Sequence, residues 1–62
     1  MATIGEQVTS KRKELKLTQM QLATKAGISL DTLSRIENNR SVNPTLVVIN
    51  LLQKALGIKF EI

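Results

Sequence analysis

The sequence predicts an all-α domain of four short helices, at about 3–15, 18–26, 29–38 and 44–56, followed by a short C-terminal strand at about 58–62. Apolar residues recur three or four positions apart through most of the chain, which is the spacing of one helix face. Residues that cap helices precede these apolar segments, and glycine or a turn-forming run follows them. The connections are short, so residues 1–62 are expected to form a single cooperative domain.

The first helix is predicted to begin at Thr3. Thr3 and Glu6 have the spacing of a capping box, in which the hydroxyl accepts the amide of Glu6 and the carboxylate accepts the amide of Thr3. The inward face of this helix consists of residues at helical spacing, namely Ile4, Val8, Leu15 and the stem of Arg12.

The second helix is predicted to begin at a second capping box, formed by Thr18 and Gln21. Its inward residues are Leu22, Ala23 and Ala26. Gly27 can adopt the left-handed conformation that ends a helix, which predicts a sharp stop.

The third helix is predicted to begin at Ser29, whose hydroxyl can cap it. Leu33 and Ile36 point inward at helical spacing. The other residues of this helix face mostly outward and form an exposed polar surface: Leu30, Asp31, Thr32, Ser34 and Arg35.

A turn-forming run, NNRSVN, separates the third and fourth helices, and Asn39 is its best candidate for a left-handed cap. Asn43 is predicted to cap the fourth helix, with Pro44 at the first helical position, where its missing amide costs nothing. The fourth helix is the most apolar and ends at Gly57; its inward candidates are Leu46, Ile49, Leu52, Leu56 and, less firmly placed, Val47 and Val48.

The tail changes from helical to strand spacing, because Ile58, Phe60 and Ile62 alternate with Lys59 and Glu61. A lone strand has an open edge, and the sequence contains no partner strand. These three apolar residues are therefore predicted to pair with the same tail of a second copy across a two-fold axis. The alternative is that the tail folds back over the core of its own chain or frays.

Composition limits the function classes. Nine Lys and Arg against five Asp and Glu give a net charge of +4, which favours a polyanionic partner. A single aromatic residue leaves no stacking platform for single-stranded nucleic acid, so duplex DNA is the better target. The chain has no His or Cys, and we expect neither an enzyme nor a cofactor or metal site. It also lacks a long apolar run, so we expect a cytoplasmic, nucleoid-associated protein.

The segment TQMQLATKAGISLDTLSRIE, residues 18–37, resembles the helix-turn-helix of the lambda-repressor-like family, which includes phage repressors, Cro proteins and bacterial XRE regulators. Gln19 matches the opening Gln of that motif, Ala23 the small residue where the helices touch, and Gly27 the turn. Leu33 and Ile36 match its buried positions. The wider pattern, from SKRKELKLTQ through IENNRSVNPTL to LLQKALG, covers nearly the whole chain.

The resemblance implies that the third helix lies in the major groove of DNA. It assigns base reading to Ser29, Leu30, Asp31, Thr32 and Arg35, and phosphate contacts to Gln19, Asn38, Asn39, Arg40 and Asn43. Simpler roles remain open for some of these residues. Asp31 can cap its helix, Arg35 can be a solvated charge, and Asn38 and Asn43 can serve the turn alone.

Arg12 and Glu37 match positions at which members of the phage-repressor branch pair an arginine with a glutamate. The resemblance therefore predicts a partly buried ion pair that holds the first helix against the third. The predicted function is a sequence-specific transcription regulator, most simply a dimeric repressor on a palindromic operator. The alternative is an antitoxin that represses its own operon and binds a protein toxin.

Overall fold

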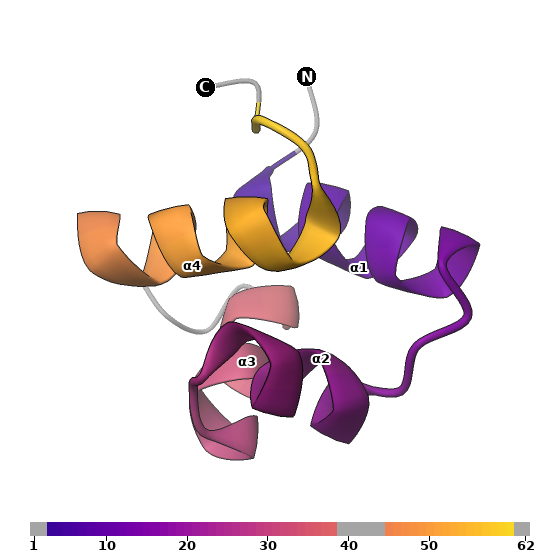
Figure 1. Ribbon diagram of the computed structural model, residues 1–62, viewed down its shortest axis with the longest axis horizontal. Coiled ribbons are helices and arrows are strands. Elements are labelled where there is room, and N and C mark those ends of the chain that lie inside the picture. The colour runs from indigo at the N-terminus through magenta and orange to yellow at the C-terminus, as the bar shows by residue number, and fades with distance from the viewer. Residues whose placement is uncertain (1–2, 39–44, 61–62) are drawn as a thin grey trace.

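The computed structural model describes residues 3–38 and 45–60, and over these ranges the chain forms four helices and no strand (Figure 1). The helices are α1 (Ile4–Glu14), α2 (Gln19–Ala26), α3 (Leu30–Glu37) and α4 (Leu46–Leu56). Helices α1 and α4 lie above α2 and α3 in Figure 1. Helix α1 packs against α3 and α4, and helix α2 also packs against α3 and α4. The four predicted helices are thus confirmed. No helix in the described ranges has the length and apolarity needed to cross a membrane.

Both predicted capping boxes are present. The Thr3 hydroxyl accepts the Glu6 amide at 3.1 Å, and the Thr3 amide donates to Glu6 Oε1 at 3.2 Å. The equivalent distances between Thr18 and Gln21 are 3.0 and 2.8 Å. These contacts satisfy amides that have no partner inside a helix, so they fix the first residue of α1 and of α2.

Two left-handed residues end the first two helices. Gly27 has φ +75° and follows α2, as the sequence predicts. Lys16 has φ +59° after α1, and the Leu17 amide donates back to the Arg12 carbonyl at 3.0 Å. This bond is the long one of a Schellman motif, which normally places glycine at the left-handed position. The sequence gives no signal for it, because a lysine stands there.

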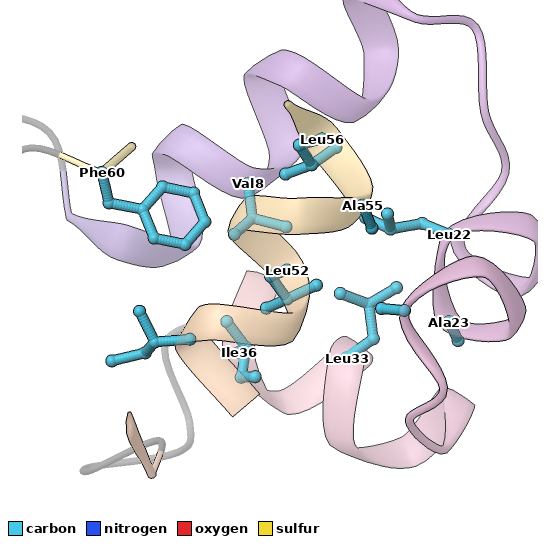
Figure 2. Close-up of a cluster of buried hydrophobic side chains, with 11 residues drawn as sticks. Val8, Leu22, Ala23, Leu33, Ile36, Leu52, Ala55, Leu56 and Phe60 are labelled. Atoms are coloured by element: carbon cyan, nitrogen blue, oxygen red, sulfur yellow. The ribbon is translucent and has the colours of Figure 1, made fainter. Parts of the chain in front are cut away.

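A single core lies between the four helices (Figure 2). Each helix contributes one side chain with no exposed surface: Val8, Leu22, Leu33 and Leu52. The other buried apolar residues surround them: Ala23, Ala26, Ile36, Ile49, Ala55, Leu56 and Phe60. The inward positions of α2 and α3 are therefore those that helical spacing predicts.

The start of α4 differs from the sequence prediction. The Thr45 hydroxyl accepts the Val48 amide at 3.2 Å, so Thr45 is the cap and the helix begins at Leu46. The cap predicted at Asn43 and the first position predicted at Pro44 lie outside the described residues. Leu46 and Val47 are 76% and 66% exposed, so their assignment to the inward face was wrong. The first turn of α4 turns them outward because Ile49 and Leu52 take the core-facing positions.

The described part of the tail, residues 58–60, packs on the core of its own chain. Residues 58–60 form no strand, and Phe60 is 7% exposed, with its ring pointing toward Val8 in Figure 2. The Phe60 amide donates to Gln53 Oε1 at 2.9 Å, which ties this segment to α4. Ile58 is partly buried against the same core, and Ile62 lies outside the described residues. Strand pairing between two tails stays a prediction.

Candidate nucleic-acid interface

The outward face of α3 is the surface that the sequence predicts to meet DNA. Ser29 caps this helix by accepting the Thr32 amide at 3.1 Å. Leu33 and Ile36 are buried and anchor the opposite face in the core. Because α3 is fixed from both its cap and its buried side, its outward residues keep a defined position relative to the domain.

The predicted base-reading residues all reach the surface. Leu30 is 42% exposed, and the side chains of Asp31 and Arg35 are 75% and 64% exposed. Ser29 is exposed and Thr32 is half-buried, with its hydroxyl oxygen accepting from the Ser29 hydroxyl at 2.7 Å. The surface therefore combines an apolar group, hydroxyls and charges of both signs, which are the groups that distinguish base edges in a major groove.

Asp31 and Arg35 form an ion pair along this face, with 3.1 Å between Oδ2 and Nε. The spacing of four residues places them on adjacent turns of α3. Ser29 caps the helix with its hydroxyl, which takes the Thr32 amide, and Asp31 lies in the first turn, where a carboxylate interacts favourably with the helix dipole. Arg35 is an exposed charge, as the simpler interpretation expects, but it has an acidic partner. Both members of the pair line a surface pocket, together with Ser34 and Asn38.

Glu37 is the last residue of α3, and its side chain is only 4% exposed because it packs against α1. Arg12 of α1 donates to it twice, from Nε to Oε2 at 2.8 Å and from Nη2 to Oε1 at 3.1 Å. The two side chains predicted to pair are therefore in bidentate contact. Arg12 Nη1 also donates to the Leu17 carbonyl at 2.8 Å, which links the pair to the connection between α1 and α2. Charge-assisted bonds of this geometry fix orientation as well as adding attraction.

Two further side chains converge on Glu37 Oε1. The Thr9 hydroxyl of α1 donates at 3.0 Å, and Gln19 Nε2, from the first residue of α2, donates at 3.3 Å. Glu37 thus joins three helices. Thr9 was not identified from the sequence. The one signal for it is its position one turn before Arg12, which indicates that both side chains can reach the same partner.

The predicted phosphate-contacting residues are only partly described. Gln19 is half-buried at the start of α2. Asn38 follows α3 as its C-terminal cap, and its Nδ2 donates to Ser34 Oγ at 3.3 Å, which is the local turn role that the sequence leaves open. The remaining three, Asn39, Arg40 and Asn43, lie outside the described residues. Within residues 3–38 and 45–60, no group of three His, Cys, Asp or Glu side chains could hold a metal ion.

This geometry agrees with comparisons to known proteins. A family model described as helix-turn-helix matches residues 9–62, from the middle of α1 to the end of the chain. The chain belongs to this family. It is of the lambda-repressor-like type, because its relatives carry the names of bacterial and phage repressors.

Two repressors illustrate the likeness. The HTH-type transcriptional repressor RghR of Bacillus subtilis (strain 168) is 44% identical over 61 residues, which cover 98% of this chain and 45% of RghR. The immunity repressor protein of Bacillus phage phi105 is 46% identical over 57 residues, which cover 92% of this chain and 39% of that protein. The chain therefore spans less than half the length of these two relatives.

A solved structure extends the likeness to three dimensions. The crystal structure of SinR of Bacillus subtilis, a master regulator for biofilm formation, in complex with DNA superposes with a TM-score of 0.87 at 32% identity. The match covers 92% of this chain and 90% of that one. The arrangement of the four helices is thus that of a protein solved with DNA bound.

Proposed function

We propose that this domain binds duplex DNA sequence-specifically as part of a transcriptional repressor, with α3 in the major groove. The exposed polar face of α3, held rigidly by its buried face and by Glu37, carries the proposal. A helix presented in this way fits a groove about 12 Å wide. The net charge of +4 and the repressor names of the relatives support the same function.

The chemistry of the α3 face suggests how bases are read. The guanidinium of Arg35 can donate two parallel hydrogen bonds to guanine, and Leu30 or the Thr32 methyl can pack on a thymine methyl. Asp31 can accept from a cytosine amine, and Ser29 can donate or accept at the first turn. We assign base reading to these five residues.

Gln19 is proposed to contact a phosphate while it supports α3. A glutamine amide has two N–H donors, and the bond to Glu37 uses one of them. The second donor is then available at the N-terminus of α2, where free amides also attract a phosphate. We propose that Asn38, Asn39, Arg40 and Asn43 contact the backbone as well and set the register of α3 without reading sequence.

A repressor of this kind is proposed to bind as a homodimer on a palindromic operator, with half-sites about 34 Å apart. The tail remains the proposed contact, although Phe60 serves the core of its own chain. Deleting Glu61 and Ile62 keeps Phe60 and is expected to convert the dimer to a monomer in sedimentation. A dimer that survives this deletion would place the contact elsewhere.

The relatives are named as repressors, so the antitoxin alternative and a toxin partner gain no support from them.

Selection of bound duplexes from a random pool tests the proposed function. The expected result is a palindromic consensus, whose affinity falls steeply with salt because phosphate contacts release counterions. Arg35→Ala is expected to lower the preference for the consensus. Lys54→Ala, which removes an equal charge from the exposed end of α4, should leave that preference unchanged. Failure to enrich any duplex would refute the proposal.

A further inference from the structure

The ion pair between Asp31 and Arg35 gives Asp31 a candidate role on α3 in addition to its proposed contact with a cytosine amine. Asp31 Oδ2 lies 3.1 Å from Arg35 Nε, and both side chains are mostly exposed. An exposed pair at this spacing contributes little to the stability of a helix. A carboxylate on a surface that meets phosphates also repels DNA. Better discrimination between correct and incorrect sequences would offset this repulsion.

The geometry of the guanidinium suggests that role. Asp31 contacts Nε of Arg35. Among the described residues, no partner contacts the two terminal nitrogens of Arg35, Nη1 and Nη2. Those nitrogens form the planar fork that matches O6 and N7 of guanine. A guanidinium held by one edge presents the fork in a restricted orientation, whereas a free arginine side chain samples many rotamers.

We infer that Asp31 is a positioning residue that makes Arg35 selective for guanine and reduces binding of this domain to other sequences. At a guanine, the two terminal nitrogens of Arg35 donate two hydrogen bonds to the base while Asp31 stays in contact with Nε. At any other base, Arg35 has no matching pair of acceptors, and the charge of Asp31 remains close to the phosphates. The carboxylate thus lowers affinity for incorrect duplexes more than for the correct one. This inference rests on the proposed function.

Two isosteric amide substitutions test it in the full chain. Asp31→Asn removes the carboxylate from α3. Glu14→Gln is the matched control: it removes the same charge from another exposed ion pair, in which Lys11 Nζ lies 3.1 Å from Glu14 Oε1 on α1. The probes are a duplex selected by the unmodified chain, its derivatives with each G·C pair replaced by A·T, and a duplex of random sequence.

With Asp31→Asn, we expect the preference for G·C at one symmetric pair of positions to fall about tenfold, within the range that one bidentate base contact provides. Affinity for the random duplex should rise, with a salt slope steeper by up to about one unit. Glu14→Gln should leave the G·C preference unchanged. In an Arg35→Ala background, Asp31→Asn should no longer change that preference, because the group it orients is gone.

The outcomes separate this inference from the proposed function. If Arg35→Ala loses the G·C preference while Asp31→Asn keeps it within about twofold, Arg35 reads guanine without help and the inference is wrong. An equal loss of preference with Glu14→Gln would also overturn it, since net charge alone would then explain the effect. If Arg35→Ala keeps the preference, the proposed reading role of α3 fails instead.

Discussion

Replacing Glu37 by alanine perturbs the network that joins α1, α2 and α3. The carboxylate is 4% exposed and accepts four hydrogen bonds, two of them from Arg12, which is 13% exposed. Its loss leaves the guanidinium partly buried with the Leu17 carbonyl as its one remaining partner among the described residues, at a cost of about 3 to 5 kcal/mol. A chain of 62 residues has a free energy of unfolding of about 3 to 9 kcal/mol, so this variant should lose a large share of its stability.

Urea denaturation followed by far-ultraviolet circular dichroism measures the effect, because the chain has no Trp or Tyr for fluorescence. Glu14→Ala, at an exposed acid of α1, serves as the control and should cost under about 0.5 kcal/mol. The double variant Arg12→Ala/Glu37→Ala should lose less than the sum of the single losses, since neither charge remains alone. If Glu37→Ala and Glu14→Ala differ by less than about 0.5 kcal/mol, the network does not hold the helices together.

Three further predictions concern the helix ends and the DNA contacts. Gly27→Ala should lower the free energy of unfolding by about 1 to 2 kcal/mol, because φ is +75° although space for the added methyl is open; thermal melting measures the loss. Lys16→Gly should raise the melting temperature by a few degrees, since its φ of +59° suits glycine, and an unchanged or lower value would contradict this. In competition binding, Arg35→Ala should relax preference at one symmetric pair of positions, whereas Arg40→Ala should weaken all duplexes alike; identical behaviour would refute the division between reading and gripping residues.

The helix starts could be predicted where the signal is local. The capping boxes at Thr3 and Thr18 depend on contacts between residues three positions apart, so the sequence displays both partners. The start of α4 was predicted from the same kind of local signal, but it was misplaced because the sequence offers two capping residues close together. Asn43 and Thr45 both have capping side chains two positions apart, and only the bond from the Val48 amide shows that Thr45 caps the described helix.

The contacts of the candidate site depend on packing that the sequence does not display. Thr9 and Gln19 lie 28 and 18 positions from Glu37 and meet it only because three helices converge. The family pattern indicated the pairing of Glu37 with Arg12, but no local spacing indicated the other donors. Alternation in the tail is likewise ambiguous, because an extended segment can direct Phe60 into the core of its own chain as readily as it can form a strand.

The chemical-shift changes of backbone amides on adding the selected duplex test the central claim most directly. If the outward face of α3 enters the major groove, the largest changes should fall on Ser29, Leu30 and Arg35, with smaller ones at Gln19. The described part of α4 should change little. Largest changes at the exposed Leu46 and Val47, with α3 unaffected, would contradict the claim.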